Sequence, residues 1–243
     1  MPTPPFPEAV LLDVGGVFHL PGHDEIAAVY RDLGHEVDRS DLNYAHYVGA
    51  THFHSDLDLD NDDVYIWGRY LNAHAETLGV PDDVRPGLMR DLGRAFVAMS
   101  AWSHQIKGSV DGARELKATG VRLGIVSNAD GTVAAVLAES ETAHVGPGNG
   151  VEVEVIIDSG VVGVSKPDPK IFEIALDAMG LDAASTWYVG DMPYFDVNGA
   201  RAAGLFPILM DPFDLHPDVD VTRVKSLFDV ADLARAARSE LDS

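Results

Sequence analysis

Residues 9–18 read AVLLDVGGVF, and this stretch decides the fold. Four apolar residues stop at Asp13, after which Gly15 and Gly16 allow the chain to turn tightly. A short continuous apolar run that ends in a polar residue and glycines is typical of a parallel strand buried on both faces. The sequence therefore predicts a buried strand with Asp13 at its carboxyl end.

The same pattern recurs further along the chain. Four later runs are apolar and give way to polar or glycine residues, and they cover Val121–Val126, Val153–Ile157, Thr186–Val189 and Phe206–Met210. Segments with helical periodicity lie between them, at 110–118, 132–139, 169–179 and 196–203. This alternation predicts an α/β fold, with a Rossmann-like parallel sheet, helices on both faces, and ligands bound beyond the carboxyl ends of the strands.

The stretch from residue 20 to residue 104 breaks this alternation. It has helical periodicity, notably over 64–78 and 88–99, without a convincing strand. We therefore predict two parts: residues 1–19 and 105–243 form the sheet-containing core, and residues 20–104 form an all-helical insertion.

The composition limits the classes of function. The chain has 39 acidic and 17 basic residues, a formal charge of −22, which repels the phosphates of nucleic acids and anionic membrane surfaces. The same charge disfavours small anionic substrates unless a cation or a lysine compensates inside the site. The sequence thus predicts neither nucleic-acid nor membrane partners, and it points to a metal.

Cysteine is absent, which excludes disulfides, thiolate zinc sites and a cysteine nucleophile. The first residues lack the basic segment and long apolar stretch of a signal peptide, and no run of about 18 apolar residues occurs. From the sequence we expect a cytoplasmic protein.

Polar side chains cluster where the predicted strands end. A lone aspartate at such a place is usually a turn or helix-cap residue, but several sets at one edge of a sheet are harder to explain in that way. Together they offer a carboxylate that can attack, groups that hold oxygens, a lysine and carboxylates for a hard divalent cation. The set consists of Asp13, Ser127, Asn128, Lys166, Asp191 and Asp196.

Four stretches carry a family resemblance. They read AVLLDVGGVF, LGIVSNADG, GVSKPDPKIF and WYVGDMPYFDVNGARAAG, in this order. The chain resembles the haloacid dehalogenase-like hydrolase superfamily in the order and spacing of these motifs. The resemblance implies that the helical insertion is a small cap that closes over the site and selects the substrate.

The resemblance also implies catalytic roles. Asp13 resembles the nucleophile that forms a covalent aspartyl intermediate. Ser127, with Asn128 beside it, resembles the residue that hydrogen-bonds the transferring phosphoryl group. Lys166 resembles the lysine that pairs with the nucleophile and the phosphate. The implied substrate is a small phosphorylated metabolite.

A magnesium site is implied as well. Asp13 and Asp191 resemble carboxylates that bind Mg²⁺ directly, and the backbone carbonyl of Gly15 is a further ligand. Asp196 resembles an outer-shell carboxylate that orients metal-bound water or Lys166. We also expect Asp196 to cap the helix that follows it.

The first motif departs from the phosphatase pattern at Gly15. Phosphatases of this superfamily carry a second aspartate there, which acts as general acid and base and contributes about 10²–10⁴-fold to the rate.

Three interpretations of this chain remain. The chain is a phosphatase that uses another proton donor, such as His19 or His23, or that acts on good leaving groups. It is a 2-haloacid dehalogenase-type enzyme, since a departing halide needs no proton. Or it is a binding module that retains the site without turnover.

Overall fold

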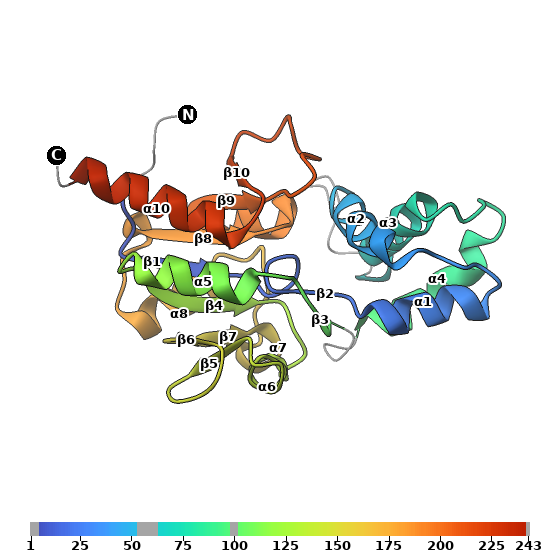
Figure 1. The fold of residues 1–243 in the computed structure, drawn as a ribbon, viewed down its shortest axis with the longest axis horizontal. Coiled ribbons are helices and arrows are strands. Elements are labelled where there is room, and N and C mark those ends of the chain that lie inside the picture. Colours follow the sequence, from blue (N-terminus) through green and yellow to red (C-terminus); the bar gives the residue numbers. More distant parts are fainter. Residues whose placement is uncertain (1–4, 53–62, 98–101, 242–243) are drawn as a thin grey trace.

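The computed structural model describes residues 5–52, 63–97 and 102–241. The described chain forms a sheet-containing core and a separate group of helices, which Figure 1 shows side by side. The last helix, α10 (Leu227–Leu241), ends on the side of the core that faces away from these helices (Figure 1). The predicted α/β fold with a Rossmann-like parallel sheet is confirmed.

The core contains one six-stranded sheet in the order β10-β9-β8-β1-β4-β7. Every neighbouring pair in it is parallel. Strand β1 lies in the middle: the chain leaves it toward β4 and β7, and later returns to its other side with β8. Ligands of open parallel sheets bind at such a reversal. The strands span Ala9–Leu12 (β1), Arg122–Ser127 (β4), Ile156–Asp158 (β7), Thr186–Gly190 (β8), Phe206–Met210 (β9) and Thr222–Val224 (β10).

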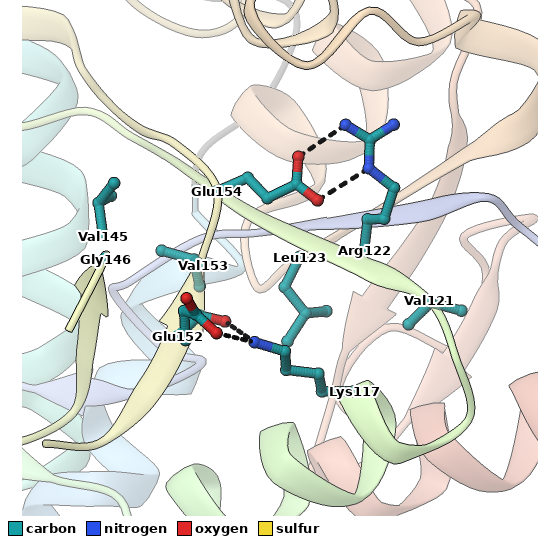
Figure 2. Close-up of a pocket in the computed structure, with 9 residues that line it drawn as sticks. All are labelled: Lys117, Val121, Arg122, Leu123, Val145, Gly146, Glu152, Val153 and Glu154. Atoms are coloured by element: carbon teal, nitrogen blue, oxygen red, sulfur yellow. Dashed lines mark hydrogen bonds and ion pairs between the residues drawn. The ribbon is translucent and has the colours of Figure 1, made fainter. Parts of the chain in front are cut away.

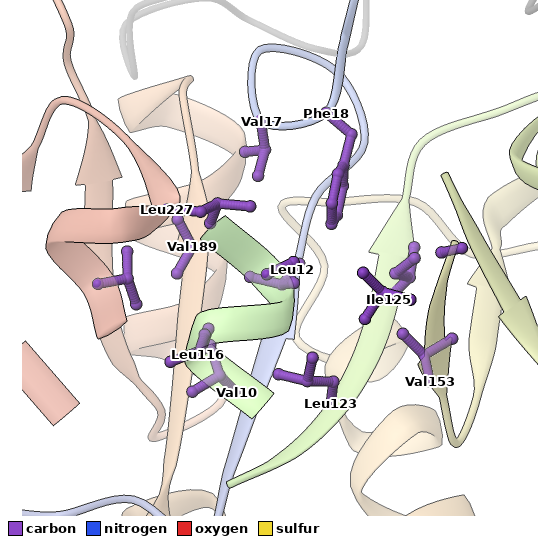
Figure 3. Packing of buried hydrophobic residues seen from close by; sticks show 14 of the residues in the cluster. Val10, Leu12, Val17, Phe18, Leu116, Leu123, Ile125, Val153, Val189 and Leu227 are labelled. Atoms are coloured by element: carbon purple, nitrogen blue, oxygen red, sulfur yellow. The ribbon is translucent and has the colours of Figure 1, made fainter. Parts of the chain in front are cut away.

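The two faces of the sheet bury different side chains. In β1, Val10 and Leu12 join one apolar cluster, whereas Ala9 and Leu11 join another. This division follows from the two-residue period of a strand, which sends successive side chains to opposite faces. Figure 3 shows the first cluster, in which Leu116 and Leu227 from the covering helices pack toward β1 and β8. A strand buried on both faces must be apolar throughout, and β1 is.

Helices cover both faces, as predicted. One face packs against α5 (Ser109–Ala118), α6 (Val133–Glu139) and α10 (Leu227–Leu241), and the other against α8 (Lys170–Met179) and α9 (Asn198–Ala202). The short helix α7 (Ser159–Val162) follows β7. Helices α5 and α10 lie side by side along the sheet (Figure 1).

Four helices form what we call the helical unit: α1 (His23–Asp32), α2 (Arg39–Ala50), α3 (Asp63–Thr77) and α4 (Arg85–Val97). Its apolar cluster includes Tyr30 and Tyr70 and extends to Met192 and Tyr194 of the core. A two-stranded antiparallel pair of β2 (His19–Leu20) and β3 (His104–Gln105) joins it to the core. The predicted division at residues 20 and 104 falls on this pair and stays a prediction. The periodic segment at 88–99 ends in residues outside the described ranges.

Some predicted boundaries were wrong. The expected strand at 153–157 is two strands, β6 (Val151–Val153) and β7, and β6 pairs with β5 (Ala143–Val145) in a separate small sheet. The expected helix at 196–203 begins earlier, as a five-residue π-helix at Pro193–Val197 that continues into α9. Strand β10 and helix α10 were not predicted. Within the described ranges, no helix is long and apolar enough to span a membrane.

Candidate active site

Three carboxylates meet beyond the carboxyl ends of β1 and β8. One oxygen from each of Asp13, Asp191 and Asp196 lies within 4.8 Å of the other two, and all three side chains are buried. The sheet explains the convergence of the first two, because Leu12 is in register with Val189 and the residues after both strands emerge at the same edge. The structure thus brings together the aspartates that the sequence singled out.

Lys166 lies inside this carboxylate cluster. Its Nζ is 2.7 Å from Asp13 Oδ2 and 2.7 Å from Asp196 Oδ1. It also donates a hydrogen bond to the Tyr188 hydroxyl at 2.9 Å. The lysine side chain is 3% exposed, so its charge has almost no access to solvent. Its position is therefore determined by the groups to which it donates.

Asp196 is held by its own turn of helix. Its Oδ2 accepts the Met192 N–H at 2.8 Å, while its Oδ1 accepts hydrogen bonds from Lys166 and Tyr188. The turn is π-helical, a geometry often found at functional sites. The expectation that Asp196 caps the following helix was wrong, because Val197 is the N-cap of α9. Asp196 instead stabilises the turn that begins at Met192.

The cluster has an unbalanced charge. Three carboxylates face one lysine, so among the described residues two negative charges remain uncompensated when all are ionised. Burial, opposed by Lys166 but reinforced by the neighbouring aspartates, raises the pKa of Asp13 to about 7. Burial and Asp196 raise the pKa of Asp191 well above its usual value. Burial would lower the pKa of Lys166, but Asp13 and Asp196 outweigh this effect and raise it.

Ser127 and Asn128 end the neighbouring strand. Ser127 is buried at the end of β4, two residues beyond Ile125, which is in register with Leu12. The Asn128 side chain binds the backbone of Lys166 twice, accepting its N–H at 2.8 Å and donating to its carbonyl at 3.0 Å. Asn128 therefore fixes the loop that carries Lys166. Its predicted contact with substrate stays a prediction, as does that of Ser127.

Glycines line the loop after Asp13. Gly16 has a φ of +65°, and a Cβ added to it would lie 2.1 Å from Asp191 Cγ, so only glycine fits beside that carboxylate. At Gly15 a Cβ would lie 3.1 Å from Cζ3 of Trp102. The indole of Trp102 therefore covers the place where phosphatases carry their second aspartate.

Helix α2 contributes a residue that sequence reasoning missed. His46 Nε2 lies 3.0 Å from Asp191 Oδ2, and His46 Nδ1 lies 2.8 Å from the Tyr70 hydroxyl. The imidazole is fully buried, and burial lowers its pKa to about 3. The ring is therefore uncharged at pH 7. The next residue, Tyr47, donates its hydroxyl to the Gly16 carbonyl at 2.7 Å. No local signal separates His46 from the other histidines of the helical unit.

The two histidines considered as proton donors are engaged elsewhere. His19 is buried, with its ring nitrogens 2.9 Å from the Trp102 carbonyl and 2.8 Å from Thr142 Oγ1. His23 binds Asn43 and stacks on His104 with ring centroids 3.6 Å apart. None of these contacts involves Asp13.

A pocket lies elsewhere, near the start of β4. Figure 2 shows that its two basic side chains are each paired with a glutamate. Lys117 binds Glu152 at 2.9 Å and Arg122 binds Glu154 at 2.6 Å. Arg122 precedes Ser127 by five residues, roughly 16 Å along a strand. The pocket is therefore separate from the carboxylate cluster, and its cations are already neutralised.

Comparison with known proteins identifies the family. The model of the haloacid dehalogenase-like hydrolases matches residues 7–204. The chain belongs to this hydrolase family. The match spans the first strand, the helical unit, Lys166 and the π-helical turn, so every residue of the carboxylate cluster lies within it.

Curated relatives of this haloacid dehalogenase-like hydrolase include two kinds of enzyme. The phosphoserine phosphatase of Thermus thermophilus is 38% identical over 90 residues, 35% of this chain and 36% of that protein. The (S)-2-haloacid dehalogenase of Pseudomonas sp. (strain YL) is 30% identical over 132 residues, 51% of this chain and 53% of that protein. The matches thus span about a third to a half of these relatives.

Solved structures share the whole fold. The HAD-hydrolase YfnB from Bacillus subtilis, solved with bound magnesium, superposes with a TM-score of 0.57 at 16% identity. The match covers 94% of this chain and 99% of that one. It therefore includes both the core and the helical unit.

Proposed function

We propose that this chain is a Mg²⁺-dependent phosphatase of a small phosphorylated metabolite, working through a phosphorylated Asp13. The observation that carries the proposal is the 2.7 Å contact of Lys166 Nζ with Asp13 Oδ2 inside a cluster of three buried carboxylates. A carboxylate held by a buried cation at the end of a central strand is suited to attack an anionic group. The phosphoserine phosphatase relative supports this class of substrate.

The donor set fits a magnesium ion. Hard divalent cations prefer carboxylate and carbonyl oxygens, and the two uncompensated charges of the cluster match a charge of +2. Asp13, Asp191 and the Gly15 carbonyl would hold the ion, while Asp196, whose two oxygens are already hydrogen-bonded, suits the outer shell. When bound, the ion would keep Asp13 ionised and offset the charge of the phosphoryl oxygens.

The reaction requires two displacements at phosphorus. In the first, a carboxylate oxygen of Asp13 forms a bond to phosphorus while the bond to the ester oxygen breaks, and the leaving group departs as an oxyanion with the electron pair and takes a proton from water. In the second, water attacks the same phosphorus, which releases inorganic phosphate and restores the Asp13 carboxylate. Lys166 remains within contact of Asp13 and lowers the repulsion between the carboxylate and the phosphate.

Gly15 affects the choice of substrate. No side chain at this position can protonate the leaving oxygen, and Trp102 covers the space. Leaving groups that are stable as anions, such as aryl or acyl phosphates, need no such proton. We therefore propose that the protein acts best on activated phosphate esters, with the helical unit acting as a cap that excludes water and selects among them.

The test is phosphate release from p-nitrophenyl phosphate with Mg²⁺. We expect Asp13→Asn to abolish release, because an amide is not nucleophilic, while the circular dichroism spectrum stays unchanged. Asp158→Asn is the matched control, since Asp158 is also buried at the end of a strand but accepts hydrogen bonds from Gly160 and Val133. We expect Asp158→Asn to keep the rate per folded molecule.

Two other outcomes would favour other functions. The glycine at position 15 also suits a dehalogenase, because halide leaves without a proton, and one relative is a 2-haloacid dehalogenase. Chloride release from 2-chloropropionate without Mg²⁺, lost in Asp13→Asn, would establish that activity instead. No turnover of any activated ester or haloacid would identify a module that binds without catalysis.

A further inference from the structure

Helix α2 of the helical unit makes two contacts with the same wall of the carboxylate cluster. His46 reaches Asp191 Oδ2 at 3.0 Å, and Tyr47 donates to the Gly16 carbonyl at 2.7 Å. Gly16 itself packs against the Asp191 carboxylate, as the 2.1 Å approach of an added Cβ shows. Consecutive residues of one helix therefore meet the core at Asp191 and at the loop beside it.

Asp191 differs from the other aspartates in how it is held. Groups of the core hold Asp13, whose Oδ1 accepts the Val14 N–H at 2.8 Å and whose Oδ2 contacts Lys166. Asp196 is likewise held by groups of the core. Among the described residues, His46 is the side chain that binds the Asp191 carboxylate, and it belongs to the helical unit. The orientation of Asp191 thus depends on the docking of α2.

The imidazole of His46 is itself held in place. When Asp191 is ionised, His46 Nε2–H donates to it, which leaves Nδ1 to accept from the Tyr70 hydroxyl at 2.8 Å. The ring also meets Trp102 edge-on, with centroids 5.4 Å apart, and Trp102 lies over Gly15. A donor fixed on both sides can orient a carboxylate, as residues behind metal ligands do.

We propose that His46 is a positioning residue that joins the docking of α2 to the orientation of Asp191, so that the metal site is complete only when the helical unit is docked. This inference rests on the proposed function in taking Asp191 as a metal ligand. The contact uses Oδ2 of Asp191, so His46 does not bind Oδ1. By reciprocity, a cation bound at Asp191 stabilises the docked arrangement of the helical unit.

The first measurement is the affinity for Mg²⁺ alone, by isothermal titration calorimetry on the full chain. We expect His46→Leu, which removes the donor at similar volume, to weaken Mg²⁺ binding by about 10- to 100-fold. His46→Gln carries an amide N–H at the end of its side chain and should restore most of the affinity. A role in packing alone would not distinguish these two variants in this way.

His74→Leu is the matched control. His74 is also buried in the helical unit, and its Nδ1 lies 2.8 Å from the Tyr30 hydroxyl, as His46 Nδ1 lies near that of Tyr70. Its described partners all belong to the helical unit. We expect His74→Leu to bind Mg²⁺ with the wild-type affinity even where it lowers the melting temperature.

The second measurement is the distance between the helical unit and the core. Because the chain has no cysteine, spin labels can be attached at Asp32→Cys in α1 and Glu139→Cys in α6, both exposed. Double electron–electron resonance should show that Mg²⁺ narrows the distance distribution in the wild-type background. It should show no such narrowing in the His46→Leu background.

Each outcome decides between the proposals. If His46→Leu binds Mg²⁺ with wild-type affinity and Asp13-dependent hydrolysis is intact, the proposed role of His46 is overturned and the proposed phosphatase function stands. Mg²⁺ binding that depends on His46 in a protein without hydrolysis keeps this role and overturns the phosphatase. A wild-type protein that binds no Mg²⁺ overturns both.

Discussion

Lys166 Nζ lies 2.7 Å from Asp13 Oδ2 and at the same distance from Asp196 Oδ1, so one buried ammonium group joins two carboxylates. Removing one partner of a buried ion pair leaves an uncompensated charge and costs about 3–5 kcal/mol. Among the residues that the structure describes, no other cation contacts this cluster. We therefore expect the lysine to stabilise the fold, and the proposed function also gives it a role in the chemistry.

We predict that Lys166→Met lowers the rate of p-nitrophenyl phosphate hydrolysis by about 10²–10³-fold, the usual effect of losing one group that stabilises transition-state charge. It should also lower the midpoint of urea unfolding. Lys170→Met is the matched control, because Lys170 is four residues away, exposed, and paired with Glu173 on the surface. A wild-type rate in Lys166→Met would show that this ammonium group takes no part in catalysis.

The aspartates predict that Mg²⁺ stabilises the protein more at high pH than at low pH. Burial raises the pKa of Asp13 to about 7 in the folded chain, above its ordinary value of 3.8. Between these values the folded state binds more protons than the unfolded state, so stability falls as the pH rises. Asp191, whose pKa is also raised by burial, acts in the same direction.

On the proposed function, Mg²⁺ binds the ionised carboxylates and should recover this loss of stability. We expect the rise in melting temperature on adding Mg²⁺ to be several degrees larger at pH 8 than at pH 5. Taking the difference between Mg²⁺ and EDTA at each pH cancels the contributions of groups far from the cluster. An equal rise at both pH values would argue that no carboxylate of raised pKa binds the ion.

The sequence predicted the core of this site because the relevant residues follow apolar strands. Four short runs end where the structure ends its strands, to within a residue or so, and strand β9 matches its predicted bounds of Phe206–Met210. Once the strands are parallel, Asp13 and Asp191 must emerge at one edge. Local pattern and topology together are enough to place these two carboxylates.

Other features could not be predicted in this way. Helix α10 buries several alanines, such as Ala231 and Ala234. This weakens the difference in hydrophobicity between its buried and exposed faces, which is the signal of an amphipathic helix. The run at 153–157 predicts one strand, but β6 ends at Val153 and β7 begins at Ile156, and no local signal in the run marks this break. His46 was missed because its contact with Asp191 spans 145 residues and depends on how α2 docks onto the core.

The buried histidines predict acid sensitivity. Burial lowers the pKa of His74 to about 3 in the folded chain, below its ordinary value of 6.5. Between these values the unfolded state binds more protons, so this contribution to stability is complete above pH 6.5 and is lost as the pH falls. From pH 7 to pH 5 the loss from His74 amounts to roughly 2 kcal/mol.

We therefore expect the free energy of unfolding of the wild type to fall more steeply between pH 7 and pH 5 than that of His74→Leu. The variant should be less stable at pH 7, because the Tyr30 hydroxyl loses its partner, and the gap should narrow at pH 5. Urea unfolding at the two pH values measures both effects. Parallel pH dependences in the two proteins would mean that His74 titrates in the folded state with about its ordinary pKa.

Gly15 offers a test of why the site lacks an acid. Its φ is not in the left-handed region, so an aspartate there needs no unusual backbone conformation. Its Cβ would lie 3.1 Å from Cζ3 of Trp102, which is tighter than an ordinary contact, so the indole must move by a few tenths of an ångström. Trp102 is buried and donates its Nε1–H to the Phe96 carbonyl at 3.2 Å, which restrains that movement.

We predict that Gly15→Asp raises hydrolysis of alkyl phosphates relative to aryl phosphates. An alkoxide needs a proton to leave, whereas p-nitrophenolate does not, and a placed general acid contributes about 10²–10⁴-fold. Gly15→Asn is the matched control, because it imposes the same contact with Trp102 without a proton to donate. The ratio of kcat/KM for an alkyl phosphate to that for p-nitrophenyl phosphate should rise in Gly15→Asp and stay at the wild-type value in Gly15→Asn.

An equal ratio in all three proteins would mean either that Trp102 keeps the new carboxylate from the leaving oxygen or that another group already donates the proton. Adding Trp102→Leu to Gly15→Asp separates these two cases, because removing the indole raises the ratio only in the first.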